Sequence, residues 1–505
     1  MYRRGIPPDA EYTFKHALVQ DAAYGILLRE PRRELHARIA ETLEGQFPEI
    51  AESQPELLAR HCTEAALIEK AAGLWGKAGQ RSLERSALVE AVAQLTRALD
   101  QIATLPATPA LRREQIKLQV ALINPLIHVK GPAAPETKTA AERARLLIEQ
   151  AEALGEPPED PRLLFSVLYV FCAANCVSFN GDAMRELAAQ FLALAEKQTA
   201  TGPRLVGHTL FGQSLLHTGD IAEGRAHYDQ ALALYDPAEP RPVVTVAHDA
   251  RVSILSHRSI GLWSLGYPEA ALADADRALK YAREIGHAAT LMFALTIPLF
   301  THIQCGSYAI ANLQSDEIVA LGDKKDTLFW NAQGMVNQGC VSVLTGKASD
   351  AVQTINAGIT AYRSTGASLY TPLWLSYLAK AYAELGQFDG AGRRIDEAMS
   401  AVATTKERWC EAEVHRTAGK IALLSPAPDV AKAEFHFDRA LTTARAQQAK
   451  SWELRTAVSL AQLRRDQGKR DEARDILTPV CVWFAEGFDT HDLKEAKALL
   501  DELAQ

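Results

Sequence analysis

Apolar residues recur along most of the chain at the spacing of an amphipathic helix, and the pattern breaks at regularly placed glycines. Around Gly219, one helical pattern ends and a second one resumes with Tyr228 and Ala231 on its apolar side. The same arrangement surrounds Gly266, and it returns at Gly306, Gly346 and Gly386 at intervals of 40 residues. A pattern of this kind predicts helix–turn–helix units repeated along the chain.

Further copies extend the pattern in both directions. The next turn glycine, Gly468, lies about two periods after Gly386, and between them Pro426 and Pro428 stand where a turn glycine is missing. An earlier copy starts at Trp75. The residues predicted to pack inside the repeats, besides the turn glycines, are Trp75, Gly79, Ala91, Gly212, Tyr228, Ala231, Ala271, Ala278, Ala351, Ala391, Ala398 and Ala473.

The residue types at these positions indicate how each unit folds. Glycine tolerates the left-handed conformation that ends a helix, and small residues allow two helices to approach closely. A single helix pair cannot bury its apolar side, but a stack of pairs can. We therefore expect an all-α protein, a right-handed α-solenoid with a period of about 40 residues. The pattern resembles the tetratricopeptide repeat, whose usual period is about 34 residues.

Composition agrees with an extended array. The chain has 505 residues, 48% of them hydrophobic and 7% aromatic, and one core stops growing at roughly 250–300 residues. A net charge of −8 gives no general reason to expect a nucleic-acid partner. The seven cysteines are scattered and no secretory signal precedes them, so we expect a cytoplasmic protein. The uncharged stretch 163–179 falls short of the roughly 20 residues that cross a bilayer, which favours a buried helix and no membrane association.

The N-terminal region carries a second resemblance. The run FKHALVQDAAYGILLREPRRELHARIAETLE is similar to the end of the nucleotide-binding module in rhizobial-type multidomain adenylate/guanylate cyclases, in which a class III cyclase precedes an AAA-type signal-transduction ATPase and a tetratricopeptide-like tail. The resemblance implies a winged-helix-like region in residues 1–60, N-terminal helical repeats in 61–200 and a tetratricopeptide-like array in 201–505. The chain departs from that family because it contains no G-x-x-x-x-G-K-[ST] phosphate loop and no cyclase catalytic domain. We therefore expect the C-terminal part of such a protein, from a truncated or split gene or as a separate tail.

Few residues suggest chemistry. The motif around His16 resembles one that contacts nucleotide in signal-transduction ATPases, with Ala17 in place of Asp, so His16 is either a nucleotide sensor or a structural histidine at a helix start. Cys172 and Cys176 share one helical face, but zinc needs four ligands, which favours a core role. The adjacent pair His61 and Cys62 points in directions about 100° apart on a helix, which is unfavourable for joint catalysis. Six tryptophans are expected mainly to fill gaps between helices, and the alternative is a peptide-binding concave face such as solenoids present: Trp263, Trp330, Trp374, Trp409, Trp452 and Trp483.

These observations favour a non-catalytic regulatory and protein-interaction module of a class III adenylate cyclase–ATPase signalling protein. The expected partners are other proteins or the cognate cyclase and ATPase domains, with no cofactor, no metal and no direct nucleic acid. The alternative is the repeat tail of a signal-transduction ATPase that regulates transcription. An independent enzyme has no support, since no nucleophile elbow, H-E-x-x-H motif or Gly-rich dinucleotide loop occurs.

Overall fold

The computed structural model describes residues 2–4, 11–13, 24–26, 28–156, 160, 162–236 and 248–505. The chain divides into two compact units, Met1–Leu122 and Ile123–Gln505, which are described separately. His16 lies outside the described residues.

The first unit begins with a short antiparallel strand pair and continues as helices. Strands β1 (Tyr2–Arg4) and β2 (Glu11–Thr13) pair with each other. The helices that follow are α2 (Arg29–Gln46), α3 (Pro48–Ser53), α4 (Pro55–Glu64), α5 (Ile68–Glu84), α6 (Leu88–Ile102) and the start of α7 (Pro109–Val129). The predicted winged-helix character of residues 1–60 stays a prediction, because much of that region lies outside the described residues.

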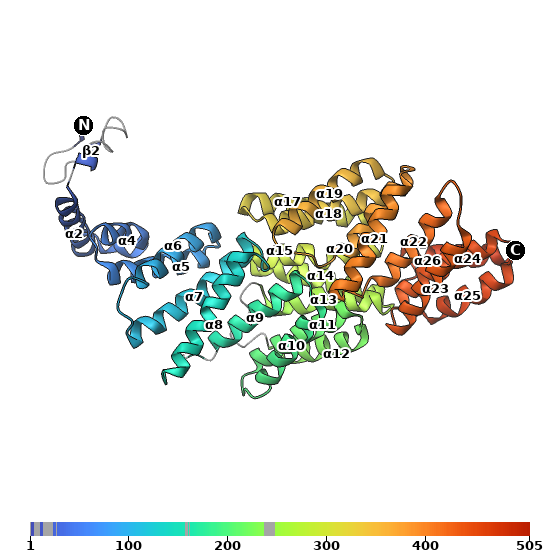
Figure 1. Cartoon of the computed structure of the whole chain (residues 1–505), viewed down its shortest axis with the longest axis horizontal. Coiled ribbons are helices and arrows are strands. Elements are labelled where there is room, and N and C mark those ends of the chain that lie inside the picture. Colours follow the sequence, from blue (N-terminus) through green and yellow to red (C-terminus); the bar gives the residue numbers. More distant parts are fainter. Residues whose placement is uncertain are drawn as a thin grey trace. The chain divides into compact units, whose positions relative to one another are not determined.

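The second unit is a series of helix pairs (Figure 1). After the end of α7, its helices are α8 (Pro135–Ala153), α9 (Arg162–Val177), α10 (Gly181–Ala195), α11 (Thr201–Thr218), α12 (Ile221–Ala233), α13 (Ala250–Ser264), α14 (Pro268–Ile285), α15 (Ala288–Thr296), α16 (Leu299–Gln304), α17 (Tyr308–Lys325), α18 (Leu328–Leu344), α19 (Ala348–Ser364), α20 (Thr371–Glu384), α21 (Phe388–Thr405), α22 (Glu411–Leu424), α23 (Val430–Ala446), α24 (Lys450–Asp466), α25 (Arg470–Trp483) and α26 (His491–Ala504). Pro298 separates α15 from α16, since proline cannot donate the helical hydrogen bond. The predicted all-α solenoid is confirmed, with the two short strands as an addition.

Small residues allow the two helices of a pair to approach closely. A Cβ atom added to Gly212 on α11 would lie 2.9 Å from the carbonyl oxygen of Gly224 on α12, and one added to Gly79 on α5 would lie 2.6 Å from Leu95 on α6. The predicted packing alanines are all 0% exposed: Ala91, Ala231, Ala271, Ala278, Ala351, Ala391, Ala398 and Ala473. Close backbone contact of this kind needs residues without bulky side chains.

The six predicted turn glycines all have positive φ, from 72° at Gly386 to 103° at Gly219. Each stands between two helices of a pair, where the chain reverses. The copy without a turn glycine reverses between α22 and α23, in the segment that contains Pro426 and Pro428.

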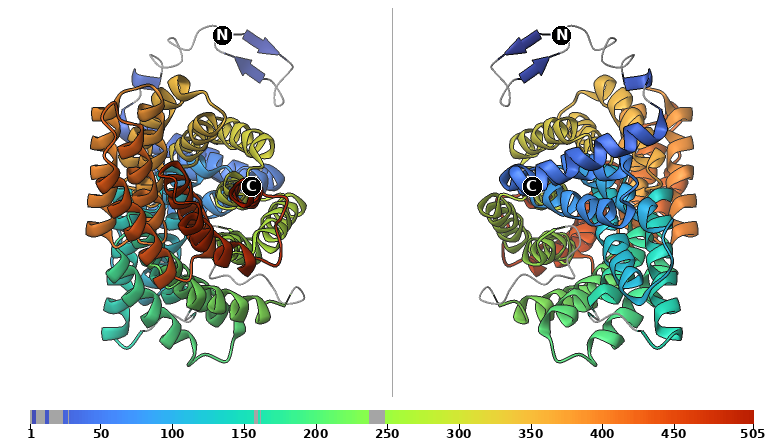
Figure 2. Two further views of the ribbon diagram at one scale, coloured as in Figure 1. Left: turned by 90° about the vertical axis from the view of Figure 1, so that its right-hand side faces the viewer. Right: turned by 90° about the vertical axis from the view of Figure 1, so that its left-hand side faces the viewer.

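The second unit winds so that helices far apart in sequence meet. In the left view of Figure 2, the green, yellow and orange segments follow one another around a common axis. The carbonyl oxygen of Val177, at the end of α9, accepts hydrogen bonds from the amides of Ser368 and Leu369, and that of His217 on α11 accepts from Arg408 and Trp409. Successive turns of the winding are therefore joined by direct hydrogen bonds.

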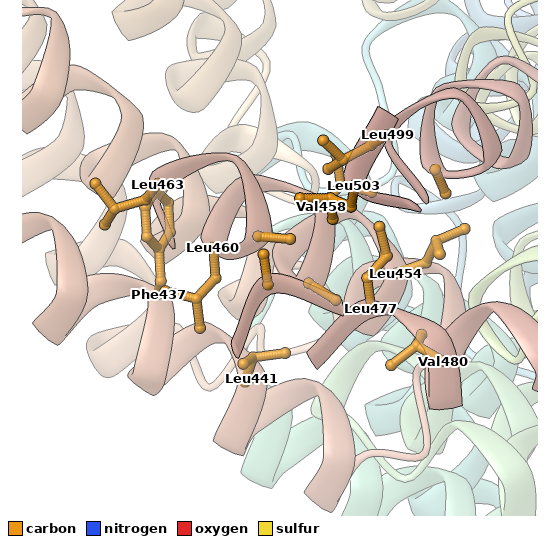
Figure 3. Close-up of a cluster of buried hydrophobic side chains, with 14 of the residues drawn as sticks. Phe437, Leu441, Leu454, Val458, Leu460, Leu463, Leu477, Val480, Leu499 and Leu503 are labelled. Atoms are coloured by element: carbon orange, nitrogen blue, oxygen red, sulfur yellow. The ribbon is translucent and has the colours of Figure 1, made fainter. Parts of the chain in front are cut away.

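Helices α22 to α26 share a leucine-rich core (Figure 3). Phe437 from α23 packs with Leu460 and Leu463 from α24, Leu477 from α25, and Leu499 from α26. Within the described residues, no helix is both long enough and apolar enough to cross a membrane.

Candidate functional site

The cysteine and histidine pairs singled out in the sequence are parts of packed helices. Cys172 and Cys176 are buried on α9 as free thiols, and burial raises the pKa of Cys172 to about 12. No group of three or more His, Cys, Asp or Glu side chains among the described residues is placed to hold a metal ion. His61 is within 2.8 Å of His36, ring nitrogen to ring nitrogen, while its neighbour Cys62 is buried.

Most of the tryptophans fill gaps between helices. Trp263, Trp330, Trp374, Trp409 and Trp452 are each at most 4% exposed. Trp483 differs, because it is 39% exposed and lies over Gly266 and the ring of Tyr267. Aromatic side chains therefore join the helices, as expected, and one of them also reaches the surface.

Charged side chains gather in a groove that no sequence motif indicates. This C-terminal groove, of about 400 Å3, is lined mainly by residues of α16, α20, α22, α24 and α26, with one residue each from α17 and α18. Its charged and polar lining residues are Gln304, Lys380, Glu384, Glu413, Arg416, Lys420, Arg455, His491, Asp492 and Glu495. The groove lies on the first helices of successive repeats.

Two arginines are held firmly in the groove wall. Arg416 donates two hydrogen bonds to the carboxylate of Glu413, at 2.6 and 2.7 Å. Arg455 donates to Asp492 at 2.8 Å and to the carbonyl oxygen of Gln304 at 2.9 Å. Burial by itself raises the pKa of Glu413, but the neighbouring Arg416 outweighs it and holds that pKa below its ordinary value. These arginines stay charged and fixed in position.

Lys420 is different, because it forms no ion pair with any described residue. It lies on α22 one turn after Arg416, and its side chain is exposed within the groove. The nearby charge of Arg416, followed by partial desolvation and the charge of Lys380, lowers the pKa of Lys420 to about 8. Desolvation also lowers the pKa of Lys380, although Glu384 lies 3.8 Å away. The lowered pKa of Lys420, whose largest cause is the charge of Arg416, indicates a positive electrostatic potential at this point of the groove.

Sequence reasoning missed this cluster. Its charged and polar members come from five helices and are spread from residue 304 to residue 495, and only the winding brings them together. The local signals are two opposite-charge pairs, Glu413 and Arg416 spaced i,i+3 on α22 and Lys380 and Glu384 spaced i,i+4 on α20. Such pairs are common on helix surfaces and do not by themselves indicate a groove.

The geometry defines the chain as a helical-repeat α-solenoid with a charged groove. No protein-family model matches the chain. An uncharacterized protein of Rhizobium meliloti (strain 1021) is 24% identical over 417 residues, which are 81% of this chain and 39% of that protein. The chain thus spans well under half the length of this curated relative. Among solved structures, a Rap protein complexed with competence and sporulation factor superposes with a TM-score of 0.51 and 12% identity, covering 77% of this chain and 99% of that one. This likeness shows the solenoid fold.

Proposed function

We propose that the chain is a non-catalytic protein-interaction module whose C-terminal groove binds an acidic segment of a partner protein. The proposal rests on one observation, that Lys420 lines the groove and has no ion-pair partner among the described residues. An ammonium held among other cations without an ion-pair partner is stabilised by a carboxylate brought beside it. Arg416 and Lys380 already have carboxylate partners in Glu413 and Glu384, so the attraction for an acidic segment depends mainly on Lys420. The Rap structure of similar fold contains a bound factor, which supports a binding role for a solenoid of this shape.

The finer part of the proposal concerns the identity of the partner. We propose a class III adenylate cyclase with an AAA-type ATPase module, because the N-terminal run resembles the end of such a module. The length of the Rhizobium relative, of which the match covers 39%, supports a larger multidomain protein around these repeats. In this role the solenoid favours one state of the enzyme by binding it more tightly than the other. The purified chain is then expected to bind no ATP and to form no cyclic AMP, and turnover above background refutes the non-catalytic role.

Binding in the groove is tested with short fluorescent poly-glutamate and poly-lysine peptides and anisotropy titration. The glutamate peptide is expected to bind, with affinity that falls as salt rises. Lys420→Gln should weaken binding about three- to tenfold. Lys432→Gln removes an exposed lysine from α23, outside the groove lining, and should leave affinity unchanged. Equal binding of both peptides, or equal losses in both variants, contradicts the proposal.

The pH dependence gives a second, independent test. Because the pKa of Lys420 is about 8, raising the pH from 7 to 9 removes its charge from the free groove. Affinity for the glutamate peptide should fall by up to about tenfold over that range. Lys420→Arg keeps a charge at pH 9 and should keep most of the affinity there. A wild-type affinity that does not change with pH excludes Lys420 as the binding group.

A further inference from the structure

A second, mostly apolar site lies inside the winding, next to α15 and α18. This inner cavity is lined by residues of α7, α9, α11, α13, α15, α18 and α19 and by the segment that leads into α20. Its apolar wall includes Tyr169, Leu210, Phe293, Phe329 and Tyr362. No Asp, Glu, Lys or Arg is among the described residues that line it. Protein interiors are normally packed without such voids, so an apolar space with aromatic walls suggests a ligand site.

Polar atoms without partners border the same space. The indole nitrogen of Trp330, the amide nitrogen of Gln333 and the hydroxyl of Tyr370 are buried and have no hydrogen-bond partner among the described residues. These three side chains are 4%, 2% and 7% exposed and all line the cavity. The large majority of buried side-chain polar atoms in proteins are paired, so three unpaired groups around one cavity indicate an absent partner.

The chemistry of these groups restricts that partner. The indole and amide nitrogens are donors only, and they lie three residues apart on α18, on one face of the helix. They require a hydrogen-bond acceptor, such as a carbonyl oxygen. His248 and His257 in the wall are uncharged at neutral pH, because burial lowers the pKa of His257 to about 3 and holds that of His248 well below its ordinary value. An ionised ligand would therefore be desolvated without a counter-charge.

The cavity also limits the size of its ligand. The space open to the centres of water-sized molecules is about 90 Å3, and one water needs roughly 10–15 Å3 by this measure. This space corresponds to about six to nine waters, which suits one ring with a short substituent. Phe293, Phe329 and Tyr362 present aromatic surface to such a ring.

We propose that the inner cavity binds an uncharged ring compound that carries a carbonyl oxygen, and that Trp330 and Gln333 donate hydrogen bonds to this oxygen. The site differs from the C-terminal groove in residues and in polarity, and its ligand does not depend on the groove's partner.

Three small probes of similar shape test this assignment on the full chain by ligand-observed saturation-transfer NMR. Acetophenone has the ring and the carbonyl, α-methylstyrene has the ring and no acceptor oxygen, and benzoate has a charge. Acetophenone is expected to bind saturably and more tightly than α-methylstyrene, and benzoate is expected not to bind. A cavity that holds only ordered water gives no saturable binding of any probe, which overturns the proposal.

Two variants of α18 locate the binding. Gln333→Leu keeps the volume and removes the donor, so acetophenone should lose about three- to tenfold in affinity while α-methylstyrene loses none. The control, Gln338→Leu, removes an amide that bonds Asp316 on the outer side of the same helix and should change neither probe. Ala173→Phe fills the cavity from α9 and should abolish binding of both ring compounds, with helix content checked by circular dichroism. If Gln333→Leu leaves the preference for acetophenone intact, the assigned donor is wrong.

Discussion

At the residue scale, one buried carboxylate distinguishes the interior of the solenoid from an ordinary apolar core. Glu407 is 0% exposed, and its Oε1 accepts hydrogen bonds from the amide of Tyr370 at 2.9 Å and from the indole of Trp409 at 3.0 Å. Its other oxygen has no partner among the described residues. Burial raises the pKa of Glu407 to about 8, with the two donated bonds opposing the rise.

Glu407 should make stability depend on pH. Between its unfolded pKa near 4.5 and its folded pKa of about 8, the folded state holds a proton that the unfolded state has released. The contribution of Glu407 to the free energy of unfolding is therefore fully present below pH 4.5. It declines as the pH rises from 4.5 to about 8, and it changes little above that pH. Glu407→Gln keeps an acceptor and cannot ionise. We expect the variant to match the wild type near pH 5 and to exceed it by at least about 1 kcal/mol at pH 9.

Thermal unfolding at pH 5, 7 and 9 measures this difference. Comparing variant with wild type at each pH cancels the opposite contribution of the buried histidines, whose lowered pKa values reduce stability in acid. Glu502→Gln, an exposed carboxylate on α26, should show no such trend. A difference for Glu407→Gln that is the same at all three values rules out Glu407 as the titrating group.

At the scale of elements, the turn glycines form two classes that look alike in the sequence. A Cβ atom added to Gly386 would meet nothing within 4 Å, whereas one added to Gly266 would lie 2.4 Å from the ring of Trp483 and 2.8 Å from Lys450. Gly386 therefore serves only the reversal of the chain. Gly266 allows the chain to reverse, and its missing side chain also leaves room for Lys450 of α24 and Trp483 of α25, which belong to the next turn of the winding.

Alanine substitutions should separate these two roles. Both glycines have positive φ, so each alanine carries the cost of the left-handed conformation, roughly 1–2 kcal/mol. Gly266→Ala must also displace Trp483 or Lys450 and should cost about 1–3 kcal/mol more. Denaturant unfolding of both variants gives the comparison. Equal losses of stability in the two variants would show that displacing Trp483 or Lys450 costs nothing.

The contrast between these glycines explains what the sequence could and could not predict. Turns at Gly266 and Gly386 and buried positions such as Ala278 follow from local rules of helix ends and close helix packing. The neighbours of Gly266 are Lys450, 184 residues away, and Trp483, 217 residues away, and no local pattern in the sequence indicates them. The same holds for the C-terminal groove, where Gln304 meets Arg455, and for the inner cavity, which Tyr169 and Trp330 both line only because of the winding.

At the scale of the second unit, these long-range bonds should change how the array unfolds. Repeat arrays whose units contact only their neighbours are expected to open in parts. Here the hydroxyl of Ser451 on α24 donates to the carbonyl oxygen of Trp263 on α13, and Arg455 on the same helix binds Gln304 at the end of α16. Helices more than 150 residues apart are thereby joined and should open together.

Arg455→Leu tests this cooperativity by hydrogen exchange. The variant removes a buried arginine and leaves the carboxylate of Asp492 without it, at an expected cost of at least about 2 kcal/mol. We expect amides of α13 and α16 to lose protection along with those of α24 and α26, by roughly thirtyfold. Arg363→Gln, which removes an exposed ion pair with Glu397 between the neighbouring helices α19 and α21, should leave protection in all four helices nearly unchanged. Loss confined to α24 and α26 would mean that the turns of the winding open independently, and that the hydrogen bonds between them do not unite the repeats into one cooperative unit.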